Sequence, residues 1–109
     1  MHIIYHYFLA MIEVFSTIIL NSTSVRAMWF EVENPYLGWY TVYYYPDPAQ
    51  NGRRKRQNNE KMAEFPAGRY FGVIGGLEEE QEYLFTITAT FNMSGQIFEG
   101  QRTEPAPPG

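Results

Sequence analysis

The chain has 109 residues, enough for one domain with its own hydrophobic core. It contains no cysteine, which excludes disulfides, zinc–thiolate sites and cysteine nucleophiles. The formal net charge of −4 argues against a general binder of nucleic acid or other polyanions. The aromatic content of 17% is typical of pleated, half-buried sheets.

The N-terminal segment is apolar, and Glu13 is its only side chain that is ionised at neutral pH. A secretory signal centred on Ile3–Ile12 lacks the usual basic residue before the apolar run. A membrane span would bury Glu13 at a cost of about 3 kcal/mol. We favour the interpretation that residues 1–15 are a loosely held leader, which continues into an edge strand at Val14–Leu20. A leader that results from an imperfect gene model would look the same.

Alternation of apolar and polar residues with a period of two predicts further short strands between turns rich in Gly, Pro and Asn. We expect these strands at Ser24–Val32, Gly38–Tyr45, Met62–Phe65, Arg69–Ile74, Tyr83–Phe91 and Gln96–Thr103. The polar segment Ala49–Glu60 is predicted to be an exposed loop. Seven short strands without helical periodicity indicate an all-β, antiparallel Greek-key sandwich.

The segment that begins at Leu77 combines an acidic turn with an alternating strand. Tyr83, Phe85 and Ile87 point to one side of that strand because they are two residues apart. Leu77 precedes Tyr83 by six residues, which is the spacing of a tyrosine corner. In such a corner the tyrosine hydroxyl bonds to the main chain upstream, so we expect Tyr83 to be buried with its hydroxyl bonded.

Several motifs, in order, resemble the fibronectin type III family. They are Thr23–Trp29, Tyr40–Tyr44, Gly76-Leu77 followed by Tyr83, Ile87 and Ala89, and the ending Thr103-x-Pro105-x-Pro107-Pro108. The resemblance implies a seven-stranded, immunoglobulin-like sandwich over residues 16–104, followed by a proline-rich linker at residues 105–109. It implies a core that includes Trp29, Tyr40, Val42, Leu77, Tyr83, Phe85 and Ile87.

The sequence departs from the family's pattern at several points, and its first strand lacks the usual leading proline. Glu79 stands where the corner commonly has proline, and the Asn92–Gly95 loop carries no Arg-Gly-Asp motif. Without the Arg-Gly-Asp motif, the best-known integrin-binding mode is not implied. The Trp-Ser-x-Trp-Ser motif of cytokine receptors is also missing from the sequence, which argues against a cytokine-receptor domain.

Residues that could carry catalysis are sparse. His2 and His6 are spaced for one helix face, but they fall in the leader, where chance placement is the simpler interpretation. Glu78 and Glu82 form a carboxylate pair that is typical of a solvated turn. We therefore predict no catalytic, cofactor or metal site.

Two sequence motifs suggest modification or charge recognition. Asn21-Ser22-Thr23 and Asn92-Met93-Ser94 are possible N-glycosylation acceptors in predicted turns. The basic run Arg53-Arg54-Lys55-Arg56 is compatible with cleavage by a proprotein convertase, with a patch for a heparin-like polyanion, or with a simple solvated loop. We favour the solvated loop.

The predicted outward side chains include Met28, Phe30, Trp39, Tyr43 and Tyr45, which either form a partner surface or cover loops and a neighbouring repeat. The family resemblance implies a non-catalytic adhesion, protein-interaction or spacer module of a secreted or cell-surface protein. Its partners would be other proteins and neighbouring repeats, without nucleic acid, and it would reach a membrane only through its parent protein. Alternatives are a repeat in the ectodomain of a receptor enzyme, such as a receptor-type tyrosine phosphatase, and an intracellular muscle-type or bacterial-enzyme-associated repeat.

Overall fold

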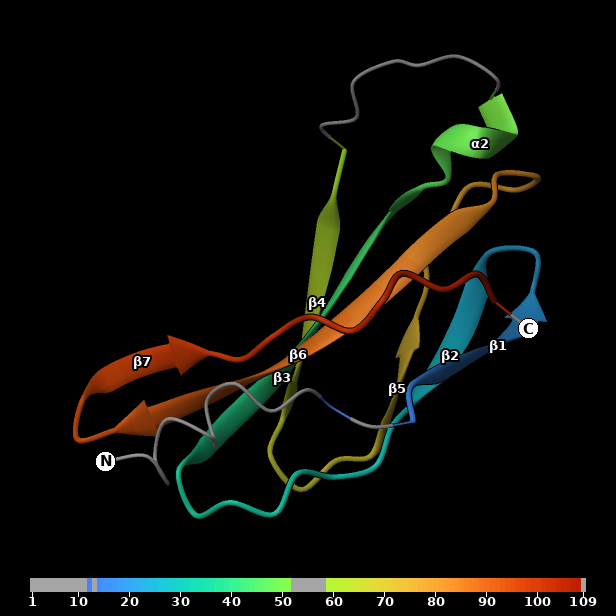
Figure 1. Cartoon of the computed structure of the whole chain (residues 1–109). Coiled ribbons are helices and arrows are strands. Elements are labelled where there is room, and N and C mark those ends of the chain that lie inside the picture. Colours follow the sequence, from blue (N-terminus) through green and yellow to red (C-terminus); the bar gives the residue numbers. More distant parts are fainter. Residues whose placement is uncertain (1–11, 13, 52–58, 109) are drawn as a thin grey trace.

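The computed structural model describes residue 12 and residues 14–51 and 59–108. These residues form seven strands and one short helix (Figure 1). The elements are β1 (Ser16–Asn21), β2 (Ser24–Met28), β3 (Leu37–Pro46), α2 (Pro48–Asn51), β4 (Lys61–Pro66), β5 (Phe71–Ile74), β6 (Tyr83–Met93) and β7 (Gln96–Glu99).

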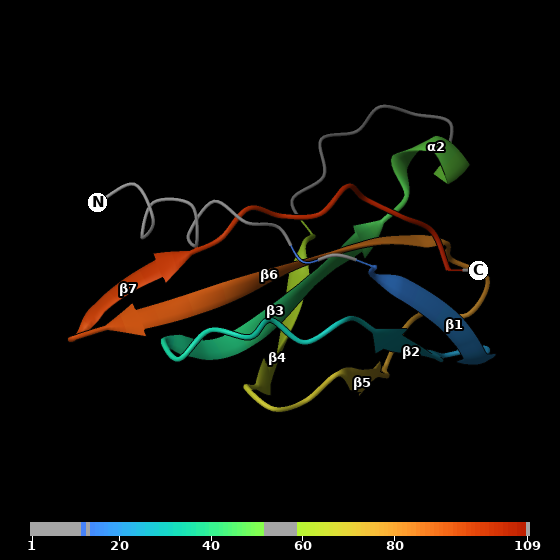
Figure 2. The same ribbon diagram turned by 60° about the horizontal axis from the view of Figure 1, so that its bottom comes forward.

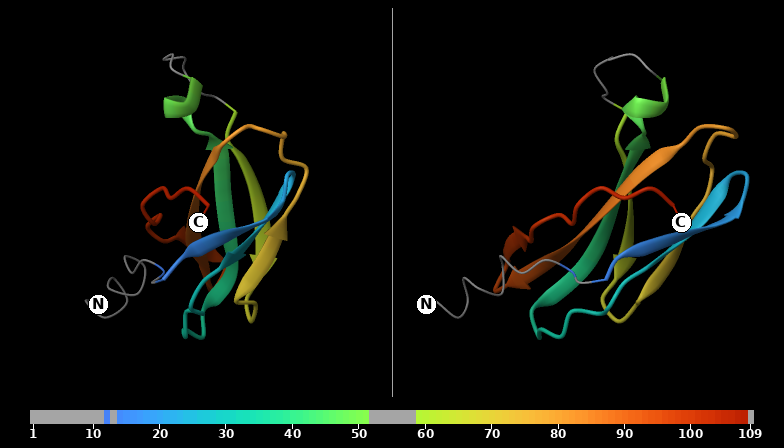
Figure 3. Two further views of the ribbon diagram at one scale, coloured as in Figure 1. Left: turned by 90° about the vertical axis from the view of Figure 1, so that its right-hand side faces the viewer. Right: turned by 45° about the vertical axis from the view of Figure 1, so that its right-hand side comes forward.

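The strands are arranged in two antiparallel sheets. One sheet has the order β1-β2-β5, and the other has the order β4-β3-β6-β7. The chain changes sheet after β2, after β4 and after β5, so the connections follow a Greek key. Figure 2 and Figure 3 show the two sheets as separate layers. The predicted all-β, seven-stranded sandwich is therefore confirmed.

The observed elements differ from the sequence prediction in several places, and local chemistry explains two of these differences, one at a strand and one at a helix. The first strand begins at Ser16, because Val14 has a left-handed backbone (φ 54°) that is incompatible with a strand. The predicted loop Ala49–Glu60 overlaps the end of α2. The carboxylate of Asp47 accepts a hydrogen bond from the N–H of Ala49 (3.0 Å), and Pro48 suits the first helical position.

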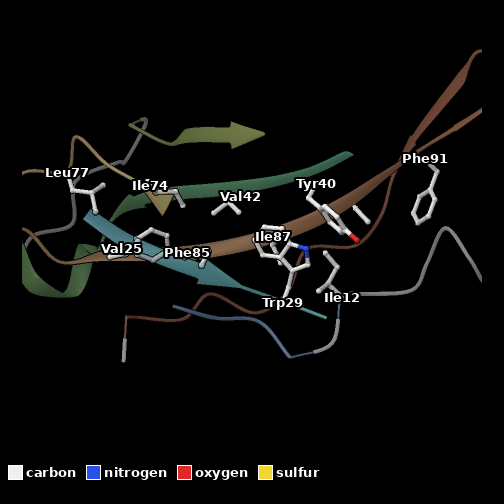
Figure 4. Close-up of a cluster of buried hydrophobic side chains, with 12 residues drawn as sticks. Ile12, Val25, Trp29, Tyr40, Val42, Ile74, Leu77, Phe85, Ile87 and Phe91 are labelled. Atoms are coloured by element: carbon white, nitrogen blue, oxygen red, sulfur yellow. The ribbon is translucent and has the colours of Figure 1, made fainter. Parts of the chain in front are cut away.

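The core lies between the sheets and is built from alternate residues of facing strands. Within the four-stranded sheet, Tyr40, Val42, Phe85 and Ile87 are each 0% exposed. The other buried hydrophobic residues are Ile12, Val25, Ala27, Trp29, Ile74, Leu77, Ala89 and Phe91 (Figure 4). The buried residues alternate along the strands with a period of two, as the sequence predicts. Residues that pair across two neighbouring strands have their side chains on the same face of the sheet, so they are buried together.

Trp29 is the central aromatic residue of this core. Its ring centroid lies 5.1 Å from that of Tyr40 and 5.7 Å from that of Phe65. Tyr40 and Phe65 are direct register partners on β3 and β4. Trp29 follows β2, in the opposite sheet, so this contact joins the two layers.

Two segments outside the expected domain boundaries contact the sandwich. Ile12, in the predicted leader, is 4% exposed and belongs to the core, and Phe15 packs against this core. Ala106, in the predicted linker, exchanges two backbone hydrogen bonds with Phe85 (3.0 and 3.1 Å). In Figure 1 this tail, drawn in red, runs along β6 toward β1. Both segments therefore pack against the sandwich, and the domain boundaries at residues 16 and 104 stay a prediction.

The side of the sandwich between β4 and β5 is closed by the ring of Phe65, which packs against Gly72. A Cβ atom on Gly72 would lie 2.3 Å from the ring of Phe65, so no other residue fits there without movement of that ring. The guanidinium of Arg69 lies 5.7 Å from the Phe65 ring centroid and 5.1 Å from that of Phe71. These cation–π contacts cover the closed side.

Replacement of Trp29 by alanine tests the importance of the contact between the layers. We expect Trp29→Ala to lower the free energy of unfolding by about 3–5 kcal/mol, because it leaves a cavity between Tyr40 and Phe65. Chemical denaturation followed by circular dichroism measures this loss. Phe30→Ala is the control, since Phe30 is 62% exposed and its removal should cost about 0.5 kcal/mol or less. Equal losses for the two variants would contradict this account.

Candidate functional site

The outer face of the four-stranded sheet carries polar and aromatic side chains. Thr86, Thr88 and Thr90 point away from the core on β6, yet they are only 3%, 0% and 4% exposed. Their register partners on β3 are Tyr43, Thr41 and Trp39. Large neighbouring side chains on this face therefore shield the threonines from water.

Arg102 holds a fixed position over this face. Its guanidinium carbon lies 3.7 Å from the ring centroid of Tyr43. Its two terminal nitrogens donate to the two carboxylate oxygens of Glu60 at 3.1 and 2.9 Å, and this hydrogen bonding is the main cause of a raised Arg102 pKa. The pair is a surface one, with side chains 43% and 39% exposed, so its contribution to stability is small. What it does is orient the guanidinium.

Glu99 links the same cluster to β6. The hydroxyl of Tyr43 donates a hydrogen bond to the Glu99 carboxylate, which also accepts one from the hydroxyl of Thr88 (3.0 Å). Burial raises the pKa of Tyr43, and the hydrogen bond to Glu99 raises it further. Burial also raises the pKa of Tyr45, with a smaller contribution from the charge of Glu60. Both phenols are therefore neutral hydrogen-bonding groups at physiological pH.

We refer to Trp39, Tyr43, Tyr45, Glu60, Glu99 and Arg102 as the aromatic–arginine face. The expected outward aromatics Trp39, Tyr43 and Tyr45 are half-buried on one sheet, whereas Phe30 is exposed on the loop that follows β2. Sequence reasoning missed Glu60, Glu99 and Arg102. The contacts that unite the face join residues 42 and 56 positions apart, so no local pattern signals them.

The tyrosine corner has the expected hydrogen bond but not the expected burial. The hydroxyl oxygen of Tyr83 accepts a hydrogen bond from the N–H of Glu78 (3.0 Å), and Leu77 is 9% exposed. The ring of Tyr83 is only half-buried, however, which corrects the prediction of a buried ring. It lies between the core and an open groove, which leaves part of its surface in contact with water.

The two possible glycosylation acceptors lie at exposed ends of strands. The side-chain oxygen of Asn21 accepts hydrogen bonds from the N–H of Thr23 and the hydroxyl of Ser24, both at 2.9 Å. The side-chain oxygen of Asn92 accepts one from the N–H of Gly95 (3.1 Å). Both asparagines are exposed, and their glycosylation stays a prediction.

Two sets of predicted residues lie outside the described part of the chain. These are the basic residues Arg53, Arg54, Lys55 and Arg56, and the leader histidines His2 and His6. Within residues 12, 14–51 and 59–108, no group of three or more His, Asp or Glu side chains is placed to hold a metal ion. The same residues contain no helix that is long and apolar enough to span a membrane.

Solved structures resemble this chain closely in fold and weakly in sequence. Chicken CNTN1 domains FN1–FN3 match with a TM-score of 0.74 and 15% identity over 91% of this chain, which spans 31% of that longer chain. The third fibronectin III domain of human KIAA0343 protein matches with a TM-score of 0.68 and 21% identity, covering 93% of this chain and 84% of that one. This chain has the fibronectin type III fold.

The FN5 domain of Drosophila Lar is a further match, with a TM-score of 0.60 and 18% identity. It covers 90% of this chain and 95% of the Lar domain. No protein-family model matches the sequence, and no curated protein matches it. The fibronectin type III fold is thus shown by three-dimensional likeness, in agreement with the resemblance of the sequence motifs.

The hydrogen bond of the fibronectin type III corner can be tested by removing one oxygen. We expect Tyr83→Phe to lower the free energy of unfolding by about 0.5–1.5 kcal/mol, because the Glu78 N–H loses its acceptor. Urea denaturation measures the change. Tyr70→Phe is the matched control, since Tyr70 is 60% exposed and should tolerate the loss of its hydroxyl. A Tyr83→Phe protein as stable as the parent would contradict a structural role for the corner.

Three tyrosines with raised pKa values predict that stability depends on pH in the alkaline range. Burial raises the pKa of Tyr40 above its ordinary 10.0, as it does for Tyr43 and Tyr45. A phenol with a higher pKa in the folded chain stabilises the fold below pH 10, and this contribution disappears as the pH rises through the folded-state pKa. We expect phenolate absorbance to rise at higher pH in the folded chain than in urea. Superimposable titrations would refute this expectation.

Proposed function

We propose that the chain is a non-catalytic adhesion, protein-interaction or spacer module of a secreted or cell-surface protein. The observation that carries this proposal is the aromatic–arginine face. Trp, Tyr and Arg are the residue types that dominate binding energy at protein interfaces. Here Trp39, Tyr43, Tyr45 and Arg102 share one face of a sheet.

The face is ordered before any partner binds. Arg102 is fixed by the two hydrogen bonds that it donates to Glu60 and by the ring of Tyr43, and the hydroxyl of Tyr43 in turn donates a hydrogen bond to Glu99. Because these side chains have already lost their rotational freedom, a partner that binds here pays less of the ordering cost. Strand β3, which carries Trp39, Tyr43 and Tyr45, is paired with β4 on one side and β6 on the other and provides a rigid support.

The location outside the cell is supported by two further observations. The exposed asparagines Asn21 and Asn92 lie at strand ends where a glycan would point into solvent. The chain also shares its fold with domains of CNTN1 and Lar. The alternative of a repeat within a receptor enzyme stays open, and the sequence of the whole parent protein distinguishes it by a membrane span followed by a catalytic domain.

Binding to cell surfaces tests the proposed function. Fluorescent beads coated with the chain should bind a panel of animal cells in a saturable manner. We expect Arg102→Ala to weaken this binding about tenfold or more, which corresponds to about 1.4 kcal/mol. Arg26→Ala is the matched control, since Arg26 is an exposed arginine on the other sheet, also near an aromatic ring.

Two results would count against the proposal. One is that no cell type in the panel binds the beads saturably. The other is that Arg26→Ala and Arg102→Ala weaken binding equally, because the aromatic–arginine face would then have no special part in it. Melting curves of both variants show whether the fold is intact.

A further inference from the structure

The lateral side of the sandwich opposite to Gly72 is open. A groove of about 340 Å³ lies there between the β1–β2 hairpin, the acidic turn before β6 and Pro108 of the tail. Figure 3 shows the C-terminal end beside β1, on the side away from β4. The apolar residues that line the groove are Ile19, Val25, Leu77, Tyr83, Phe85 and Pro108. This size is within the range of ligand sites in proteins.

Ile19 shows that the groove exposes a part of the core face. It pairs directly with Val25, so both side chains point to the same side of the sheet. Val25 is 3% exposed, whereas Ile19 is 58% exposed. On the closed side of the sandwich, the ring of Phe65 covers the equivalent space. No described residue covers Ile19 in this way.

The strand that carries Ile19 is also an edge strand. In the described part of the chain, β1 pairs only with β2, so its other edge faces outward. Ser16–Asn21 contains no charged residue and no proline, which are the usual protections of an exposed edge. The main chain of β1 can therefore pair with a further strand.

The rim of the groove is acidic. Glu78, Glu80 and Glu82 line it, and none of its described lining residues is lysine or arginine. The negative potential of this rim favours a basic ligand and disfavours an acidic one, whatever further contacts these glutamates make.

We propose that this groove takes an extended, basic and apolar segment of another protein. The segment adds to β1 as a further strand, inserts an apolar side chain between Ile19 and Leu77, and directs a basic side chain toward the acidic turn. Main-chain pairing supplies affinity, while the apolar groove and the acidic rim supply selectivity. This inference rests on the proposed function as an interaction module, but it uses a different surface from the aromatic–arginine face.

The test uses a short capped peptide in which lysine alternates with valine and leucine, and a second peptide with glutamate in place of lysine. Fluorescence anisotropy of the labelled peptides measures their binding to the whole chain. We expect the lysine peptide to bind at least about tenfold more tightly than the glutamate peptide, with an affinity that falls as salt is added.

Two neighbouring isoleucines provide a matched pair of variants. Ile18 and Ile19 are both exposed on β1, but Ile18 pairs with Arg26 on the outer face. We expect Ile19→Lys to weaken binding of the lysine peptide about tenfold and Ile18→Lys to change it by less than about twofold. The added charge is the same in both. If Ile19→Lys lowers the melting temperature, Ile19→Thr and Ile18→Thr replace the pair.

The acidic rim has its own control. We expect Glu78→Gln to weaken binding and reduce its salt dependence, whereas Glu64→Gln, at an exposed position of β4, should change neither. Equal effects of the two isoleucine variants, equal binding of the two peptides, or no binding of the lysine peptide would overturn the proposal. So would concentration-dependent self-association of the free chain that blocks the peptide, because a second copy would then occupy the groove.

The outcome is separable from that of the proposed function. Arg102→Ala should leave peptide affinity unchanged, since Arg102 is not among the residues that line the groove. If cell binding fails while the peptide still binds selectively, the aromatic–arginine face is wrong and the groove stands. The reverse result removes the groove alone.

Discussion

The contact of Trp29 with Tyr40 and Phe65 is the interaction on which the sandwich depends. It brings one aromatic ring from the three-stranded layer against two from the four-stranded layer. Such rings bury large areas and fix the spacing between sheets. Tyr40 also accepts a hydrogen bond at its hydroxyl from the N–H of Val32 (2.9 Å), which ties the connection between the sheets to the same cluster. The outer face of β3 is rigid because its inner face is anchored here.

The fold follows from features that are local in the sequence. Period-two alternation places Val25 and Trp29 on one side of a strand and Arg26 and Phe30 on the other, and turn residues separate the strands. The spacing of Leu77 and Tyr83 gives the corner its hydrogen bond. These properties depend on a few neighbouring residues, so a single sequence reveals them.

The candidate site depends on contacts between segments that are distant in the sequence, and for that reason the sequence alone did not predict it. Arg102 meets Glu60 and Tyr43 only because β4, β3 and the segment after β7 are brought together by sheet pairing. The half-exposure of Tyr83 has the same origin. Whether a ring is covered depends on what stands opposite it across the sandwich, and alternation along one strand carries no information about that.

Because the tail pairs with β6 and also forms part of the groove wall, a force on the tail would act on the groove. Ala106 is held to Phe85 by two backbone hydrogen bonds, and the flanking Pro105 and Pro107 have no N–H to add others. Tension along the tail loads these two bonds in shear, so they resist together and then fail together. Because Pro108 forms part of the groove wall, peeling the tail away would dismantle one side of it. A segment seated in the groove and a force pulling on the tail would therefore oppose each other.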